Sequence, residues 1–167
     1  DLLREDQPET HRAAGEKIRL QGEEPLTEGS FERKSGWQTV RFPAVAQARF
    51  FCLEALSAFD GTNVAAIAEW EVLGVDGRPL PRETWKIRYA DSEETRSGNR
   101  TADKIFDLQE STFWQTVDHV AYPHQLVIDL GKVQPVSGFR YLPRAEEGCP
   151  GMIETYKVFA KTSDFAY

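Results

Sequence analysis

The sequence has no long hydrophobic run, few cysteines and no excess of basic residues, and each absence excludes something. The longest apolar stretches, such as Leu126–Ile128, are far too short to span a bilayer. The net charge of −7 disfavours binding to nucleic acids and to anionic membranes, because both require clustered lysine and arginine. This charge is compatible with binding to neutral sugars.

Two cysteines, Cys52 and Cys149, are too few to identify the redox compartment. A disulfide between them is one interpretation, and two separate thiols are the favoured one. Neither cysteine lies beside a histidine in the sequence, so nothing indicates a thiol nucleophile.

The remaining composition is that of an ordinary globular domain. Hydrophobic residues make up 40% and charged residues 28% of the 167 residues, which is enough chain for one domain with its own core. Residues 1–15 are polar, contain Pro8 and lack a sustained apolar face, so we expect a linker or a frayed terminus there. The sequence shows no signal peptide and begins at Asp1, and we expect it to be a segment of a longer protein.

Short apolar or alternating runs recur through the rest of the chain and predict β-strands. The predicted strands are 17–20, 38–42, 48–56, 65–73, 84–89, 125–130, 136–142 and 155–160. Turn-forming pairs such as Asp60-Gly61 and Gly131-Lys132 separate them, and only 102–107 suggests a short helix. Many short strands with such turns indicate an all-β, antiparallel sandwich. Residues 49–56 and 125–130 lack a clean polar face, which is typical of strands in the middle of a sheet.

The second half of the chain carries a series of specific phrases. They are ADKIFD at 102–107, STFWQT at 111–116, YPHQLVIDLG at 122–131, FRYLPR at 139–144 and GMIETYKV at 151–158. In this order they resemble the discoidin, or coagulation factor type C, family and especially its family 32 carbohydrate-binding modules. The resemblance implies a galactose-binding-domain-like jelly roll.

The first half resembles a different part of the same family. Residues 29–31, 40–42, 48–56 and 67–73 are similar to the last strands of such a module. Residues 16–77 thus resemble the family's C-terminal half and residues 78–167 its N-terminal half. A circular permutant explains this order, and so does a chain cut across two tandem modules whose halves complement each other. We favour a single permuted domain over 16–167, because separate half-modules would leave open sheet edges.

The resemblance implies a calcium ion with a structural role in the loop before Trp114. The implied ligands are Asp107, Thr112 and Glu69 through their side chains, and Lys104, Gln109 and Ala68 through nearby backbone carbonyls. Such an oxygen cage suits a hard cation. The family commonly has glycine where this chain has Leu108, and leucine tolerates a positive φ poorly, so we expect a reshaped loop. A solvated acidic turn without metal is the alternative.

The resemblance also implies a sugar site. Its four positions, which are histidine, an aromatic residue, arginine and asparagine in galactose-binding members, read Gln115, Asp118, Arg144 and Pro150 here. Only the arginine is kept, and its guanidinium suits vicinal hydroxyls because it donates two parallel hydrogen bonds. The candidate pocket comprises Arg144, Gln115, Asp118, His119 and Glu146, with Phe59 or Tyr122 as a stacking face. The alternative for Arg144 is a surface ion pair with Glu146 or Glu147.

We therefore expect a non-catalytic carbohydrate-binding module of a larger secreted or cell-surface protein, accessory to a carbohydrate-active enzyme and bacterial by its resemblance. Its expected partners are a glycan and domains of the parent protein, without nucleic acid or membrane insertion. The alternative is a structural spacer or protein-interaction module with an eroded sugar site. A glycoside hydrolase would need two carboxylates flanking a cleft, and the paired glutamates of this chain offer candidates only by composition. Phospholipid binding usually needs basic surroundings, which the net charge of −7 does not favour.

Overall fold

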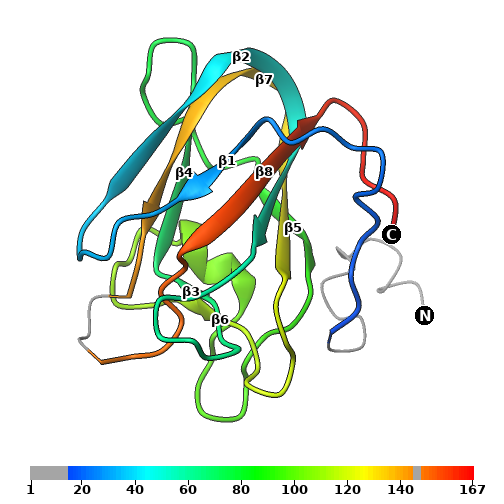
Figure 1. Ribbon diagram of the computed structural model, residues 1–167. Helices are drawn as coiled ribbons and strands as arrows, with labels where there is room; N and C mark the ends of the chain where they lie inside the picture. Colours follow the sequence, from blue (N-terminus) through cyan, green and yellow to red (C-terminus); the bar gives the residue numbers. More distant parts are fainter. Residues whose placement is uncertain (1–14, 145–147) are drawn as a thin grey trace, which may run out of the picture.

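β-Strands dominate the computed structural model, which describes residues 15–144 and 148–167. The strands are β1 (Thr27–Ser30), β2 (Gln38–Ala55), β3 (Ala66–Ile67), β4 (Glu69–Leu73), β5 (Lys86–Ala90), β6 (Trp114–Gln115), β7 (His124–Leu142) and β8 (Thr155–Lys161), and one 3-10 helix, η1, spans Ala102–Phe106. The strand pairs are antiparallel (Figure 1). The predicted all-β sandwich is confirmed, as is the short helix at 102–107.

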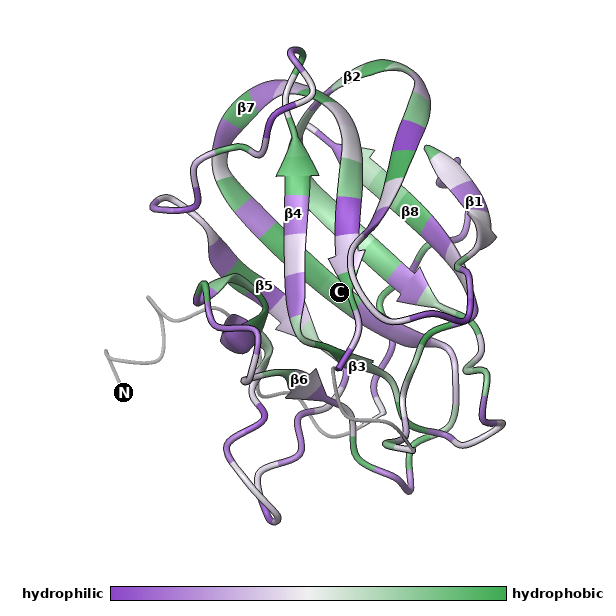
Figure 2. Ribbon diagram, turned by 90° about the vertical axis from the view of Figure 1, so that its left-hand side faces the viewer, coloured by the Kyte–Doolittle hydropathy of each residue, from purple (hydrophilic) through white to green (hydrophobic). Residues whose placement is uncertain are grey.

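The architecture is built around two long strands, β2 and β7. The main sheet has the order β1-β8-β2-β7-β4, and β5 also pairs with β7. β2 pairs with β7 along almost its whole length, with register shifts between Arg41 and Ala46 and between Ala48 and Phe50. Both strands arch over the top of the molecule, so each contributes to both layers of the sandwich (Figures 1 and 2).

Different neighbours flank the two ends of this long pair. β8 pairs with residues 50–55 of β2, and β5 pairs with residues 126–129 of β7. At the other end, β4 pairs with residues 138–142 of β7. The small β3–β6 sheet and η1 lie below the long strands in Figure 1.

The predicted turn at Gly131-Lys132 is wrong, because β7 continues through it. Gly131 has a φ of 89°, and its amide donates a hydrogen bond of 2.8 Å to Asp129 Oδ1. A Cβ at this position would lie 2.7 Å from Cβ of Thr84, so only glycine lets the strand bulge past that residue. The predicted strand at 17–20 is reduced to a bridge between Arg19 and Ala166. Alternation did not predict β1, although the resemblance placed 29–31 among the family's last strands.

The main core lies between the two layers and is rich in aromatic rings. Trp70 stacks on Phe139 with centroids 4.6 Å apart, and Trp85 and Trp114 are also buried, as predicted. Residues 50–53 of β2 and 124–128 of β7 are buried on both faces of the sheet, as their sequence pattern indicates. Figure 2 shows the long hydrophobic stretches of β7.

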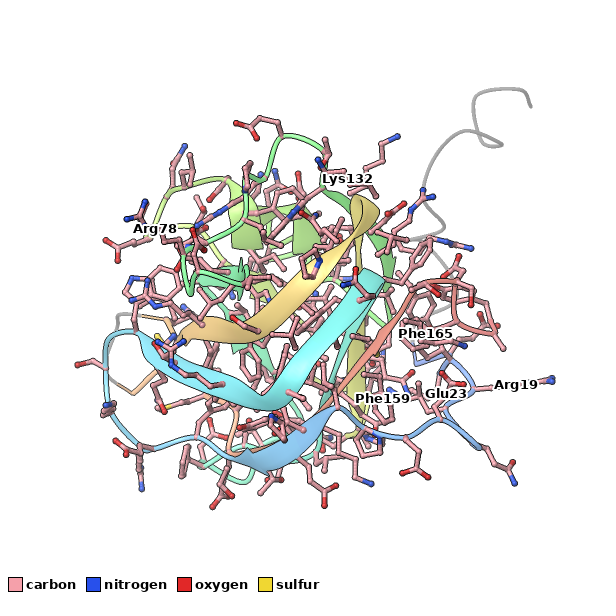
Figure 3. All side chains as sticks on the ribbon, turned by 90° about the horizontal axis from the view of Figure 1, so that it is seen from above. Arg19, Glu23, Arg78, Lys132, Phe159 and Phe165 are labelled. Atoms are coloured by element: carbon pink, nitrogen blue, oxygen red, sulfur yellow. The ribbon has the colours of Figure 1, made fainter. Side chains whose placement is uncertain are left out.

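A second hydrophobic cluster covers the outer face of the sheet where the two ends of the described chain meet. It comprises Ile18, Phe50, Cys52, Tyr89, Val127, Phe159 and Phe165. Figure 3 shows Phe159 and Phe165 on the same side of the molecule as Arg19 and Glu23. Within the described residues, no disulfide joins Cys52 to Cys149, and Cys52 is buried in this cluster.

One buried carboxylate, Asp91, ties the segment after residue 15 to the sheet. Its Oδ2 lies 2.6 Å from Nζ of Lys17 and 2.8 Å from Nδ1 of His124, and its Oδ1 accepts the amide of Gln125 at 3.0 Å. Its backbone carbonyl accepts the amide of Gly15. Because Asp91 is fully buried, its charge depends on these partners.

We expect Asp91→Asn to lower the free energy of unfolding by about 3 kcal/mol, because the substitution leaves Lys17 and His124 without their anionic partner. Urea unfolding followed by tryptophan fluorescence measures this change. The control is Asp118→Asn, at a highly exposed side chain, where the change should stay within about 0.5 kcal/mol. Equal effects of the two substitutions would contradict the anchoring role of Asp91.

Candidate functional site

The short sheet β3–β6 positions Gln115, the residue at the family's histidine position. Ala66 pairs with Gln115 and Ile67 with Trp114. The loop 94–100 folds over this strand, since the amide of Glu94 donates to the carbonyl of Gln115 and the amide of Gln115 donates to the carbonyl of Arg100. This folding brings the side chain of Arg100 to that of Gln115.

Two guanidinium groups converge on the side chain of Gln115. Oε1 of Gln115 accepts hydrogen bonds of 2.9 Å from both Arg100 and Arg144. The guanidinium carbons of Arg144 and Arg100 lie 3.8 Å and 4.9 Å from the ring centroid of Phe113. Because Gln115 is only 7% exposed, it is placed to orient the arginines rather than to contact a ligand.

Arg144 also borders a cleft of about 500 Å³, here called the Arg144 cleft. Its lining residues are Arg33, Lys34, Ser35, Phe59, Asp60, Ala66, Pro143, Arg144, Gly148, Cys149, Pro150, Gly151 and Met152. They come from the β1–β2 connection, the segment after β2, the start of β3 and the two sides of the β7–β8 connection. These segments lie in the lower left part of Figure 1. This volume is sufficient for a small saccharide.

The structure brings Arg144 together with Gln115 and with Phe59. Phe59 is half-buried, its amide donates to the carbonyl of Met152, and it lines the same cleft as Arg144. Asp60 fixes the adjacent turn, because its Oδ2 accepts the amide of Gly151 at 3.2 Å. Phe59 is therefore the predicted aromatic residue that lies where a sugar ring could stack.

Asp118, His119 and Tyr122 are not among the described residues that line the cleft. Asp118 and His119 are exposed and lie beside each other, with Nδ1 of His119 3.7 Å from Oδ1 of Asp118. The hydroxyl of Tyr122 donates a 2.6 Å hydrogen bond to the carbonyl of Val64, and burial raises the pKa of this hydroxyl far above its usual value. Glu146 lies outside the described residues.

The sequence interpretation missed four side chains around Arg144. These are Phe113 and Arg100 behind it, and Arg33 and Lys34 in the cleft lining. Arg33 and Lys34 lie 110 residues or more before Arg144 in the chain, so only the fold brings them near. Phe113 directly precedes Trp114, which was predicted to be buried. Because successive residues of a strand point to opposite faces, Phe113 could have been predicted to point outward.

Several residues of the implied calcium loop lie close together. Thr112 donates a short hydrogen bond to Asp107 through its hydroxyl, and the amide of Gln109 donates to Asp107 Oδ1 at 3.0 Å. The carbonyl of Lys104 accepts the amide of Asp107 at 3.4 Å. Leu108 has a φ of 64°, so the turn keeps the left-handed conformation natural to glycine, and the expectation of a reshaped loop is wrong at this residue.

Glu69 brings a second carboxylate to the same place. Its Oε1 accepts a 2.7 Å hydrogen bond from Arg82, while its buried Oε2 has no hydrogen-bond partner among the described residues. Burial, opposed by the hydrogen bond from Arg82 and reinforced by neighbouring Asp107, raises the pKa of Glu69 to about 7. Ala68, the last of the implied ligands, precedes Glu69 and is fully buried, with its amide donating to the carbonyl of Leu142.

These groups fit a hard cation better than a transition metal. The described residues contain no group of three or more histidine, cysteine, aspartate or glutamate side chains placed to hold a metal ion. Calcium differs from such metals because backbone carbonyl and hydroxyl oxygens can supply much of its shell. An orphaned buried carboxylate oxygen beside Asp107 is the feature that a bound cation would satisfy.

The strand order and the cleft at the loops define an antiparallel jelly-roll sandwich with a candidate ligand site at one end. A comparison with protein families gives a more specific result. Residues 89–165 match the model of the F5/8 type C domain. The resemblance to the discoidin family is therefore confirmed over these residues. The similarity of residues 16–77 to the family's last strands stays a prediction.

The chain is also similar to a curated relative, a sialidase of Micromonospora viridifaciens. The two are 31% identical over 84 residues, which is 48% of this chain and 13% of the sialidase. The match thus spans about an eighth of that protein.

In the described part of the chain, no helix has the length and apolar character needed to cross a membrane.

Proposed function

We propose that this chain is a non-catalytic carbohydrate-binding module that brings a larger extracellular protein to glycans through the Arg144 cleft. The observation that carries the proposal is the placement of Arg144 and Phe59 in one cleft of about 500 Å³. A guanidinium can donate paired hydrogen bonds to sugar hydroxyls, and an aromatic ring can pack against the C–H face of the sugar. The family match over residues 89–165 supports this role.

The similarity to the sialidase supports an accessory role in a carbohydrate-active protein. The matched 84 residues are 13% of that enzyme, which leaves most of its chain for other parts. The proposed partners are accordingly a glycan and the neighbouring domains of the parent protein, and the proposed location is outside the cell.

A spacer or protein-interaction module is the second candidate. It is favoured by the full engagement of Gln115 with Arg100 and Arg144, and by the exposed, separate position of Asp118 and His119. These features remove three of the polar groups, Gln115, Asp118 and His119, that the sequence assigned to the sugar site. The binding experiment below separates the two functions.

We expect the protein, presented as a tetramer to gain avidity, to bind saccharides on a glycan array, and Arg144→Ala to weaken that binding by about tenfold or more. Each site alone should bind with micromolar to millimolar affinity, because a shallow cleft buries little of the ligand. The control is Arg78→Ala, an exposed arginine outside the cleft. Folded protein that binds no saccharide would favour the spacer.

We propose further that Asp107, Thr112 and Glu69 hold a structural calcium ion, with carbonyl oxygens near Lys104, Gln109 and Ala68. The ion would neutralise two neighbouring carboxylates and satisfy the orphaned Oε2 of Glu69. Its contribution would be to the stability of the loop 104–112, which leads directly into Phe113 and β6. Calcium would thereby support the position of Gln115 without contacting the glycan.

Saturating calcium should raise the melting temperature by about 5 °C or more, since a ligand bound only to the folded state stabilises it. Differential scanning calorimetry in calcium, in magnesium and in EDTA measures the change. Asp107→Asn should abolish the increase, whereas Asp103→Asn, at an exposed residue of η1, should preserve it. An identical melting temperature with and without calcium would exclude the site.

We also propose that residues 16–167 form one circularly permuted domain. β2, from the half that resembles the family's C-terminal part, lies between β7 and β8 from the other half. A tight turn leads from β4 toward β5, with Gly74 donating to the carbonyl of Arg78 and a bridge joining Leu73 to Pro79. The start of the first half also lies beside the end of the second half, because a β-bridge joins Arg19 to Ala166.

A chain that starts at Arg78, runs to Tyr167 and continues through a short flexible linker to residues 15–77 restores the family's usual order. We expect it to be a monomer with a free energy of unfolding within about 1 kcal/mol of the original, because the new linker joins ends that are already close. Light scattering and urea unfolding measure both properties. A dimeric original chain would instead indicate that the halves complement each other between molecules.

A further inference from the structure

His124, at the start of β7, is a buried histidine whose two ring nitrogens both face oxygen atoms. Nδ1 lies 2.8 Å from Oδ2 of Asp91, and Nε2 contacts the backbone carbonyl oxygen of Asn63. The side chains of His124 and Asp91 are both fully buried, so bulk solvent cannot take the place of either contact. The protonation of the ring is therefore set by these two oxygens.

Both oxygens accept hydrogen bonds. The carbonyl of Asn63 cannot donate, and the carboxylate of Asp91 already accepts from the ammonium of Lys17 and from the amide of Gln125. A neutral imidazole has a single N–H and would turn the lone pair of its other nitrogen toward an oxygen. The contacts thus fit an imidazolium with two N–H donors, and the anionic Asp91 offsets the cost of burying that cation.

The carbonyl that His124 contacts belongs to residues 59–66, here called the 59–66 segment, which form part of the wall of the Arg144 cleft. The segment contributes three residues to the lining, Phe59, Asp60 and Ala66. Between them, the carbonyl of Asn63 faces His124 and the carbonyl of Val64 accepts the hydroxyl of Tyr122. His124 therefore joins the cleft wall to Asp91 in the interior of the protein.

Loss of one proton from the ring breaks this connection. A neutral ring keeps its N–H toward Asp91, since a hydrogen bond to an ionised acceptor is stronger than one to a carbonyl. Nε2 then turns a lone pair toward the carbonyl oxygen of Asn63, and the two repel each other. The stabilising contact is present while the ring holds two protons and is lost as the pH rises.

We propose that His124 is a proton-dependent positioning residue. As the imidazolium it holds the 59–66 segment, and with it Phe59, at the Arg144 cleft, and it releases the segment when the pH rises. The consequence for ligand binding rests on the proposed glycan-binding function, whereas the consequence for the segment does not.

Other ionisable groups lie around His124 and Asp91, directly or through Gln125 and Tyr122. They are Lys17, Cys52, Glu54, Asp60, Tyr122 and Tyr141. Burial raises the pKa of the Cys52 thiol and the pKa of both tyrosine hydroxyls far above their usual values, so these three groups stay protonated where histidine titrates. Glu69, whose pKa is about 7, titrates in the same range, and a variant without the His124 ring retains it.

Nuclear magnetic resonance of the labelled chain from about pH 5 to pH 8, the range in which histidine ordinarily changes charge, tests the proposal without a ligand. Proton–nitrogen spectra of the imidazole rings distinguish the imidazolium from each neutral tautomer, and hydrogen exchange gives the protection of the amides of the 59–66 segment. We expect His124 to carry both N–H protons at the acid end. Protection of the segment should fall about tenfold as one ring proton is lost, which corresponds to one hydrogen bond from a charged donor.

Two neutral replacements separate the two contacts of the ring. The amide of glutamine reaches the place of Nε2 and can donate to Asn63 at every pH, whereas the shorter asparagine reaches only the place of Nδ1. We expect His124→Gln to keep the protection of the segment within about threefold at all pH values, and His124→Asn to show low protection throughout. The strand amides of β2 and β7 are the reference that separates this local effect from a loss of overall stability.

The glycan array, repeated at both ends of the pH range, tests the consequence for binding. We expect the signal of the wild-type chain to fall about threefold at the alkaline end, because Phe59 is displaced, and that of His124→Gln to stay constant. Binding to no saccharide would remove the proposed function and leave the positioning role to the exchange data.

Three results would overturn the inference. The first is a single ring N–H on His124 at acid pH, and the second is a ring that keeps both protons over the whole range. The third is a pH response of the segment that persists in His124→Gln, because it would belong to Glu69 or to another neighbouring group.

Discussion

The structure depends on the pairing of β2 with β7. These strands come from opposite halves of the sequence, and each is long enough to belong to both layers of the sandwich. Every other strand of the main sheet is placed by pairing, directly or through β8, with one of them. Backbone groups of two central, apolar strands have no alternative partner in the core, so the pairing fixes the register of the whole sheet. It also makes the two halves of the chain depend on each other.

This pairing has a direct consequence for the site. Arg144 follows the end of β7, and Arg33 and Lys34 lie in the connection that leads into β2. Because β2 and β7 are antiparallel, the start of one strand lies beside the end of the other, and Gln38 pairs with Tyr141. The loops that carry the cations are thereby held on one side of the molecule. The strands fix the positions of the loops, and the loop side chains provide the groups that could contact a ligand.

The sequence was sufficient to predict the class of fold, but not which side chains the fold brings together at the cleft. Alternation and turn residues predicted the sandwich, and the tryptophans predicted the core. Gly131 was misinterpreted because a glycine at a positive φ can mark a bulge as well as a turn, and only its contact with Thr84 decides which. Arg144 was named from the resemblance, and Phe59 was one of two aromatic residues suggested as a stacking face. Arg100, Arg33 and Lys34 needed tertiary contacts that no local pattern contains.

The most direct test of the account is a map of the glycan site by nuclear magnetic resonance. The uniformly labelled chain would be titrated with a saccharide that it binds, and the amide shifts would be followed residue by residue. The account predicts that the largest shifts occur at 33–35, 59–60, 144 and 148–152, with smaller ones at 113–115. Shifts centred on any other face, or none at saturating saccharide, would contradict the assignment of the Arg144 cleft as the binding site.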